Sequence, residues 1–366
     1  MRALMDASQA GNRSGTGRHV TELCRALTGM DDAGSWTVLC PPGFHPGDRF
    51  HRIALPGGPV RRRLTIWARI GSWCRDSKAD LVYFPSSAAV SGCPCPMVMQ
   101  VHDLCYRAHP EWFPASRRAW YSMSIDRPAR RADLILADSQ STADDLCRLL
   151  RIPAERIKVV YLGVSERFRP LSPEETGRMR HQLGCPDGYL LFVGTIEPRK
   201  NLARLARAWD RIAEDIRLPL VVAGRRGWRC GEWDDTLRSL RHAPMLAGHV
   251  ADEDLPRLVG AATALVWPSL MEGFGLPPLE AMACGVPVIT SNRSSLPEIC
   301  GDAALLVDPE SEMALAEAMR AVATETSLQE RLRAAGLNRA AGFTWESCAR
   351  RTVEALSQVS GGRSAG

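Results

Sequence analysis

Short apolar runs recur along the whole chain and are separated by segments with helical periodicity. The segment that carries Leu202, Leu205 and Trp209 repeats its apolar residues as one face of a helix does. Strands that alternate with helices form parallel sheets with helices on both faces. Besides one in the first residues, the predicted strands are Trp36–Cys40, Arg52–Leu55, Asp80–Phe84, Met97–Val101, Asp133–Ala137, Ile157–Tyr161, Tyr189–Gly194, Pro219–Gly224, Thr263–Trp267, Val286–Thr290 and Ala304–Val307.

A polar, proline-bearing segment, Ser165–Pro173, divides the predicted strands into two series. At 366 residues the chain is too long for one ordinary core, because domains usually hold about 100–150 residues. We therefore expect an α/β protein of two Rossmann-like doubly wound domains that face across a cleft, with ligands at the carboxyl ends of the strands. The first domain is predicted at 1–168, with a helix from 343–360 packing back on it, and the second at 169–342.

The composition argues against a nucleic-acid-binding protein, a zinc protein and a membrane-spanning protein. The chain has 45% hydrophobic residues, 24% charged residues and a net charge of +5, without the blocks of like charge that indicate nucleic-acid binding. Its twelve cysteines lack the spacing of zinc ligands, and we expect most to be buried thiols in a reducing cytoplasm. No apolar run approaches the roughly eighteen residues of a membrane span. The first residues leave no room for a signal peptide, so we expect a cytoplasmic protein.

Two glutamates, Glu272 and Glu280, flank a loop of glycines and prolines in S-L-M-E-G-F-G-L-P-P-L-E. Pro268 breaks the preceding strand, so the loop lies at the carboxyl end of that strand, and Pro277 and Pro278 suit the first turn of a helix. Backbone amides at a helix N-terminus suit an anion or a hydroxyl-rich ligand. Taken singly, Glu280 could complement the helix dipole and Glu272 could be a solvated loop residue. Together they could hold two polyols on either side of a phosphate, which is the layout of a nucleotide sugar.

A second strand-to-helix loop supplies positive charge. The strand Tyr189–Gly194 runs into G-T-I-E-P-R-K-N, so Arg199 and Lys200 project from the same edge of the same predicted sheet. Taken without the glutamate loop, Arg199 and Lys200 could be solvated cations before a helix that Asn201 caps. Beside a nucleotide sugar they would lie where its diphosphate binds.

These motifs resemble the donor half of glycosyltransferase family four, a group of retaining enzymes with the GT-B fold that includes many bacterial mannosyltransferases. The resemblance rests on V-G-T-I-E-P-R-K-N-L, L-A-G-H-V-A-D-E-D-L and W-P-S-L-M-E-G-F-G-L-P-P-L-E-A-M-A-C-G-V-P-V-I-T-S-N, and it covers the C-terminal half. Glu272 and Glu280 match the E-x7-E signature of the family.

The N-terminal half resembles the same family less sharply. G-N-R-S-G-T-G-R-H, residues 11–19, resembles a glycine-rich loop that packs close to the donor diphosphate, where bulk is not tolerated. V-H-D-L-C-Y-R-A-H-P-E-W-F-P resembles the segment with a cleft-facing histidine, here His102. Taken singly, His102 could also be a structural residue of the fold. F-T-W-E-S, residues 343–347, begins a helix that in this fold crosses back onto the first domain.

The resemblance implies a role for each site residue. Glu280 would bind the ribose hydroxyls, and Glu272 would hold the donor sugar together with nearby amides. Arg199 and Lys200 would neutralise the leaving diphosphate, all the more because Thr195 stands where many members have arginine. His102 would orient the donor sugar in a front-face reaction in which the leaving phosphate helps to deprotonate the acceptor. The implied catalytic residues are His102, Glu272, Arg199 and Lys200, and the implied donor-binding residues are Gly15, Gly17, Gly194, Thr195, Val250, Gly273, Phe274, Gly275, Leu276 and Glu280.

The substrates follow from the resemblance only in part. GDP-mannose is the favoured donor, because the G-T-x-E-P-R-K-N form occurs in a branch rich in mannosyltransferases. We expect no cofactor and no metal, since the acidic run Asp252–Asp254 precedes a predicted helix and suits a cap. The resemblance implies that the first domain binds the acceptor and the second binds the nucleotide-sugar donor. The acceptor would be a glycan, a lipid-linked sugar or a small-molecule hydroxyl.

Arginines and tryptophans in the first domain leave the membrane question open. Arg61–Arg63 with Trp67, Arg69 and Trp73, and the segment Arg117–Arg131, could rest on anionic lipid at the inner face of the membrane or form an ordinary solvated face. Two other function classes also stay open. One is a nucleotide-sugar epimerase or hydrolase on the same fold, and the other is a non-catalytic nucleotide-sugar-binding subunit.

Overall fold

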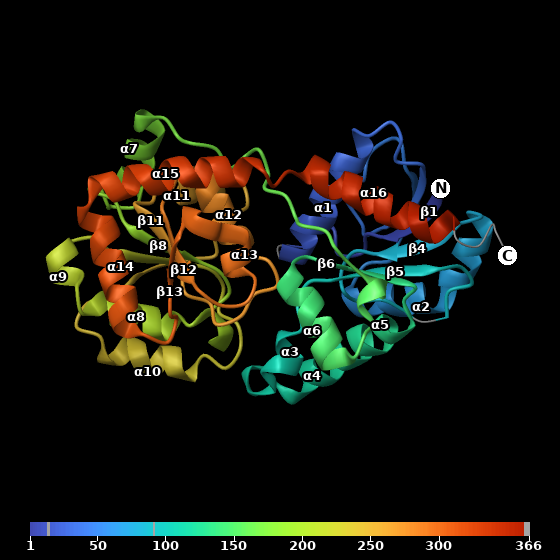
Figure 1. The fold of residues 1–366 in the computed structure, drawn as a ribbon, viewed down its shortest axis with the longest axis horizontal. Helices are drawn as coiled ribbons and strands as arrows, with labels where there is room; N and C mark the ends of the chain where they lie inside the picture. The colour runs from blue at the N-terminus through green and yellow to red at the C-terminus, as the bar shows by residue number, and fades with distance from the viewer. Residues whose placement is uncertain (13–14, 91, 362–366) are drawn as a thin grey trace. The chain divides into compact units, whose positions relative to one another are not determined.

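The computed structural model describes residues 1–12, 15–90 and 92–361 and divides the chain into two units, each built on one parallel sheet (Figure 1). Unit 1 comprises Met1–Ala108, Ala115–Gly163 and the chain from Thr344 onward. Unit 2 comprises His109–Pro114 and Val164–Phe343. The two doubly wound units confirm the predicted α/β fold class and its two domains.

Unit 1 is built on a seven-stranded sheet in the order β3-β2-β1-β4-β5-β6-β7, in which every pairing is parallel. Its strands are β1 (Arg2–Asp6), β2 (Ser35–Cys40), β3 (His51–Ala54), β4 (Leu81–Phe84), β5 (Met97–Val101), β6 (Leu134–Ala137) and β7 (Ile157–Val159). Its helices are α1 (Gly15–Thr28), α2 (Pro59–Asp76), α3 (Cys105–Ala108), α4 (Ala115–Tyr121), η2 (Ser122–Asp126), α5 (Arg127–Arg131), α6 (Gln140–Leu150), η3 (Ala154–Arg156) and α16 (Trp345–Gly361). The order reverses between β1 and β4, which makes that point a candidate ligand crevice.

Unit 2 is built on a six-stranded parallel sheet in the order β10-β9-β8-β11-β12-β13. Its strands are β8 (Leu190–Val193), β9 (Leu220–Ala223), β10 (Met245–Gly248), β11 (Ala264–Trp267), β12 (Val288–Ser291) and β13 (Leu305–Val307). Its helices are η1 (Pro110–Trp112), α7 (Pro173–Gln182), η4 (Pro198–Lys200), α8 (Leu202–Asp210), α9 (Ala213–Ile216), α10 (Gly231–Ser239), α11 (Leu255–Gly260), α12 (Leu276–Ala283), α13 (Leu296–Cys300), η5 (Gly301–Ala303), α14 (Glu312–Thr324) and α15 (Thr326–Ala341). Here the order reverses between β8 and β11.

The strands follow the predicted runs because the central ones are buried on both faces. All residues of β4, β5, β6, β9, β11 and β12 are buried, and such strands read as continuous apolar runs. Only β10 was missed. It is a half-exposed edge strand, Met-Leu-Ala-Gly, without the β-branched residues that mark a strand.

The change of unit lies earlier than the predicted boundary at 168. The Val164 N–H donates to the Phe343 carbonyl at 3.0 Å, and Phe168 is buried within unit 2. The segment Ser165–Pro173 therefore belongs to unit 2. Its end, Ser172, forms a capping box with Glu175 that starts α7.

The last helix returns to unit 1, as expected. Figure 1 shows α16 beside α1, although the two come from opposite ends of the chain. The return is tight at Gly163, where an added Cβ would stand 2.3 Å from the Trp345 backbone nitrogen. All twelve cysteines are free thiols, and most are buried. Among the described residues, no helix is both long and apolar enough to cross a membrane.

Candidate active site

The predicted donor-site residues of unit 2 gather at the carboxyl edge of its sheet, on both sides of the point where the strand order reverses. Arg199 and Lys200 lie in η4, which follows β8. Glu272 lies in the loop that follows β11, the strand next to β8. Ligands of doubly wound sheets bind in the crevice at such a reversal, so the topology places these charges where a ligand is expected.

Four charged side chains form one cluster there. The two carboxylate oxygens of Glu272 contact different cations, Arg199 Nη1 at 2.6 Å and Lys200 Nζ at 2.5 Å. On its other side, Arg199 Nε contacts Glu197 Oε1 at 2.7 Å. Lys200 also lies over the ring of Trp267, with Nζ 4.1 Å from the centroid. We call Glu197, Arg199, Lys200 and Glu272 the charge cluster.

Burial makes this pairing necessary. Lys200 is only 6% exposed and Glu272 only 7%, and an unpaired charge at such positions is costly. Burial acts to raise the pKa of Glu272, but the charges of Arg199 and Lys200 outweigh it and the net direction is downward. Burial and Arg199 lower the pKa of Lys200, against the opposing effect of Glu272 and Glu197. Glu272 is thus held ionised between two cations.

The structure corrects one expectation about this edge. The two oxygens of Glu272 pair with Arg199 and Lys200, and its contact with the donor sugar stays a prediction. Asn201 does not cap α8 with its side chain, whose amide donates to the carbonyls of Pro268 at 3.1 Å and Pro309 at 2.6 Å. Asn201 therefore ties the η4 turn to the loop after β11.

Hydroxyl groups from the next loop hold the glycine loop. Ser295 Oγ donates to the carbonyls of Phe274 at 2.8 Å and Glu272 at 3.0 Å. The Glu272 N–H donates to Ser294 Oγ at 3.1 Å. The Phe274 ring packs edge-on against Phe343 at 5.9 Å. The serine hydroxyls and the Phe343 ring thus hold the backbone around Gly273 in one conformation, which is the preorganisation that a binding loop needs.

The helix after this loop begins as predicted, at Leu276 with prolines in its first positions. Gly275 precedes it with a φ of +113°, and Gly285 ends it with a φ of +68°. Glu280 lies close to the first turn, as predicted, as the fifth residue of α12, and it is only 2% exposed. Its carboxylate is therefore a buried group of α12.

The remaining predicted residues of unit 2 also lie at strand ends. Gly194 and the exposed Thr195 follow β8, and Val250 follows the edge strand β10. Residue 224 must be glycine, because a Cβ at Gly224 would stand 1.8 Å from the Gly194 carbonyl oxygen. The loops after β8 and β9 can therefore approach closely because Gly224 has no side chain.

In unit 1, His102 follows β5 and ends a chain of buried hydrogen bonds. Its Nδ1 lies 2.7 Å from Asp138 Oδ2, and Gln100 Nε2 donates to the other oxygen of Asp138 at 2.7 Å. The Tyr83 hydroxyl donates to Gln100 Oε1 at 2.5 Å. Burial lowers the pKa of His102, but Asp138 outweighs it and the net direction is upward. His102 Nε2 has no hydrogen-bond partner among the described residues.

Two further rings extend this network from His102. His19 on α1 meets its ring edge-on at 5.2 Å and stacks on Trp345 of α16 at 5.8 Å. His19, Asp138, Gln100 and Glu197 were not among the site residues predicted from the sequence. The signal for Asp138 was its place directly after the predicted strand that ends at Ala137, the neighbour of the strand before His102.

The two glycines predicted to lie in a loop are instead in a helix. Gly15 and Gly17 form the first turn of α1. A Cβ at Gly17 would stand 2.0 Å from the Asn12 carbonyl oxygen, so the chain's own backbone already requires glycine there. Residues 13–14 of the same motif lie outside the described residues.

The acidic run before α11 also differs from expectation. Asp254 stands at the N-cap position, but its side chain makes no capping hydrogen bond. Over the described part of the chain, no group of three or more histidine, cysteine, aspartate or glutamate side chains could hold a metal ion.

The buried His19 predicts a stability change at mildly acidic pH. Burial, with a contribution from His102, lowers the pKa of His19 to about 3. The pKa of a histidine in the unfolded chain is about 6.5. Because the folded state binds a proton on His19 less readily than the unfolded state does, the fold loses stability as the pH falls below that value. Each pH unit in this window costs about 1.4 kcal/mol, so wild type should lose about 2 kcal/mol between pH 6.5 and 5. His102, with its raised pKa, contributes stability that is fully present below pH 6.5 and adds no loss there.

Denaturant unfolding of unit 1 at pH 7, 6 and 5 measures this effect. His19→Phe should flatten the pH dependence, because the stacked ring stays but the proton site is removed. His51→Gln is the control, since His51 is exposed on β3. A His19→Phe protein with the wild-type pH slope would contradict the assignment.

Family models match both halves of the chain. Residues 176–339 match the family described as glycosyl transferases group 1, and residues 13–168 match the one described as Glycosyltransferase Family 4. O-antigen chain mannosyltransferase B of Escherichia coli is 39% identical over 264 residues, which are 70% of this chain and 69% of that protein. Serotype-specific mannosyltransferase WbdA of Escherichia coli is 32% identical over 63% of this chain, which is only 29% of that longer protein.

Solved structures match the whole chain. HepE of Anabaena, in complex with UDP-glucose, superimposes with a TM-score of 0.76 at 20% identity, over 98% of this chain and 100% of HepE. WaaG, a glycosyltransferase involved in lipopolysaccharide biosynthesis, gives 0.75 at 18% identity, over 99% and 100%. Both establish the fold, and with the curated relatives they define a glycosyltransferase of the GT-B class. The chain belongs to glycosyltransferase family 4.

Proposed function

We propose that this enzyme transfers a hexose, with mannose favoured, from a nucleoside diphosphate sugar to a glycan hydroxyl with retention of configuration. The observation that carries the proposal is the charge cluster at the strand-order reversal of unit 2. Two relatives named as mannosyltransferases support the sugar, and GDP-mannose is the donor we favour. The donor and the acceptor are parts of this proposal.

The charge cluster suits a leaving diphosphate. Glu272 pairs with Arg199 and Lys200, and Asn201 ties their turn to the loop after β11. Preorganised cations in a dry site stabilise developing negative charge at about 3 kcal/mol or more per group. The reaction can therefore use protein cations for the leaving group, and we propose that it needs neither a metal ion nor a cofactor.

Glu280 and His102 complete the proposed donor site. Glu280 would accept the ribose hydroxyls. His102 would orient the donor sugar through Nε2, because Asp138 fixes the ring through Nδ1. In the front-face reaction, the bond from the anomeric carbon to the phosphate oxygen breaks while the acceptor oxygen bonds to the same carbon. The acceptor proton then passes to the leaving phosphate.

A donor screen tests the proposal. We expect GDP-mannose to give an acceptor-dependent product by mass spectrometry, with UDP-glucose, UDP-N-acetylglucosamine and dTDP-rhamnose less effective, and with activity retained in EDTA. An epimerase or hydrolase would give product without an acceptor. A non-catalytic subunit would give none. Loss of activity in EDTA that manganese or magnesium restores would contradict the metal-free reaction.

Glu280→Gln should weaken binding of the nucleoside diphosphate alone. A ribose hydroxyl pair then loses a charged acceptor worth about 1.5–3 kcal/mol, which is about 10-fold to 150-fold in Kd. Calorimetry measures the change, with Glu310→Gln as the control because Glu310 is exposed and pairs with Arg293. Equal affinity in the Glu280→Gln and Glu310→Gln proteins would remove Glu280 from the nucleotide site.

We also propose peripheral association with an anionic membrane through α2. Val60, Leu64 and Trp67 repeat along one face of that helix and are 70%, 61% and 69% exposed. Arg61 and Arg69 are exposed beside them. An exposed apolar stripe flanked by arginines suits the interface of a membrane with anionic lipids.

Vesicle sedimentation tests the membrane proposal. Trp67→Gln should lower binding to phosphatidylglycerol vesicles severalfold, because a large interfacial side chain is lost. Trp112→Gln is the control, since Trp112 lies outside α2 and its ring stacks on His109. Equal sedimentation of the Trp67→Gln and wild-type proteins would rule out this face.

A further inference from the structure

Three cysteines of unit 1 lie close together, outside the proposed donor site. Cys74 is in the last turn of α2, and Cys93 and Cys95 precede β5 in the sequence Cys-Pro-Cys-Pro. The side chains of Cys74 and Cys95 form a hydrogen bond, and Cys93 is near enough to both to affect them electrostatically. The proposed glycosyl transfer uses none of these thiols.

The topology brings Cys74 and Cys95 together at the amino edge of the sheet. After Cys74 the chain turns, with the Ala79 N–H donating to the Cys74 carbonyl at 2.9 Å, and then enters β4. Cys95 directly precedes Pro96, whose carbonyl accepts from the N–H of Val82 in β4 at 2.9 Å. β4 and β5 are parallel neighbours, so the segments that enter them lie at the same edge.

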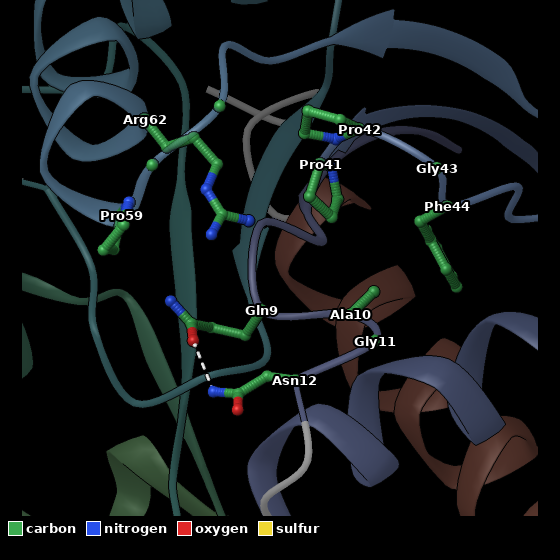
Figure 2. Close-up of a pocket in the computed structure, with 12 residues that line it drawn as sticks. Gln9, Ala10, Gly11, Asn12, Pro41, Pro42, Gly43, Phe44, Pro59 and Arg62 are labelled. Carbon is green, nitrogen blue, oxygen red and sulfur yellow. Dashed lines mark hydrogen bonds between the residues drawn. The ribbon is translucent and has the colours of Figure 1, made fainter.

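This edge is opposite to the one at which ligands of such sheets bind. Figure 2 shows a pocket of about 680 Å³ at that carboxyl edge, lined in part by Pro59 and Arg62 from the start of α2. As far as the structure describes it, the lining contains no cysteine. The helix α2 therefore runs from the pocket to the cysteines, and a covalent bond at its far end would tie it to the sheet.

The exposure of the thiols separates this pair from a second pair in unit 1. Cys93 and Cys95 are half-buried, whereas Cys74 is only 3% exposed. Cys24 and Cys40 also interact, but both are buried, so an oxidant does not reach either. A redox-sensitive cysteine is typically accessible and lies beside a second cysteine that resolves the oxidised form. Cys95 and Cys74 match these two roles.

The hydrogen bond indicates which thiol reacts first. The bond to Cys95, together with burial, raises the pKa of the Cys74 thiol, so Cys74 keeps its proton. A thiol that donates to a neighbouring sulfur favours the thiolate form of that neighbour. Burial raises the pKa of Cys93 to about 12, which makes Cys93 a poor nucleophile at neutral pH. Cys95 is therefore the sulfur that attacks an oxidant.

We propose that Cys74 and Cys95 are a modification site, at which a low-molecular-weight disulfide such as oxidised glutathione produces a reversible disulfide bond. The Cys95 sulfur attacks one sulfur of the small disulfide, whose S–S bond breaks and releases one thiol. The Cys74 sulfur then attacks Cys95 and releases the second thiol, which takes the Cys74 proton. Two cysteine thiols are oxidised, and one small disulfide is reduced to two thiols.

Peptide mapping by mass spectrometry tests the proposal on the folded wild-type protein. We expect oxidised glutathione to join the peptide of Cys74 to that of Cys95, and dithiothreitol to separate them. Cys95→Ser should abolish the link, whereas Cys93→Ser should keep it. Cys74→Ser should retain glutathione on Cys95, because the sulfur that displaces it is missing. Cys147→Ser is the matched control and should keep the link, since Cys147 is also half-buried but lies in α6.

Three results would overturn the modification site. They are a wild-type protein without the link, a link of Cys95 to Cys93 in place of Cys74, and a link that persists in the Cys95→Ser protein. The wild-type map needs no variant to fold, and Cys95→Ser changes only a half-buried side chain. Sugar transfer is not measured, so the result is independent of the proposed function.

Discussion

Replacing Lys200 by methionine is expected to lower kcat by about 100-fold to 1,000-fold, because one removed donor of a preorganised site costs about that much. Lys200 is buried and its ammonium is fixed between Glu272 and the Trp267 ring. Its charge is worth most when the diphosphate leaves, so turnover should fall more than affinity for the free nucleoside diphosphate. Methionine keeps the length of the side chain and removes the charge.

Steady-state rates and calorimetry on the same protein separate the two effects. Lys158→Met is the matched control, because Lys158 lies on the edge strand β7 and its ammonium bonds the Gln358 amide at the surface of unit 1. Arg199→Met should act in the same direction as Lys200→Met. If the Lys200→Met protein turned over at the rate of the Lys158→Met protein, the cluster would not serve the leaving group.

Much of the fold could be predicted because the central strands carry their own signal. Strands such as β6 and β9 are buried along their whole length, and their sequences, Leu-Ile-Leu-Ala and Leu-Val-Val-Ala, are apolar runs. The edge strand β10 has one exposed row of residues and no β-branched side chain, so its sequence matches a loop as well. A strand that is only half-buried has a weak hydrophobic pattern, so the sequence predicts it poorly.

The candidate site could be located from the sequence, but its pairings could not. The loops with Arg199, Lys200 and Glu272 were placed at one sheet edge because parallel strands end together. That Glu272 contacts both cations depends on the separation of two loops more than seventy residues apart in the chain, which spacing does not encode. Asn201 likewise read as a cap, because only the fold brings Pro268 and Pro309 within reach of its amide.

The surroundings of His102 show the same limit. His102 could be singled out as a residue at a strand end. Its partner Asp138 directly follows the neighbouring strand β6. Gln100, which lies within β5, donates a hydrogen bond to the other oxygen of the same carboxylate. A buried polar residue inside an apolar strand marks such a network, and Gln100 was the signal available in the sequence.

Replacing Glu272 by glutamine is expected to destabilise unit 2 by about 3–5 kcal/mol, because removal of one partner leaves buried charges uncompensated. Arg199 would keep Glu197, whereas Lys200 would lose its only carboxylate contact among the described residues. Adding Lys200→Met to Glu272→Gln should therefore cost less than the sum of the two single changes, and a double-mutant cycle in urea measures that coupling.

Glu312→Gln is the control for the destabilisation expected of Glu272→Gln. Glu312 pairs with Arg207 at 2.7 Å, but both side chains are about one-third exposed, at 29% and 33%. Exposed pairs contribute about 0–1 kcal/mol, so this variant should unfold near the wild-type urea concentration. Glu272→Gln should unfold well below it. Should the two proteins unfold together, or should the double variant be as unstable as the summed singles, Glu272 would not hold the cations in place.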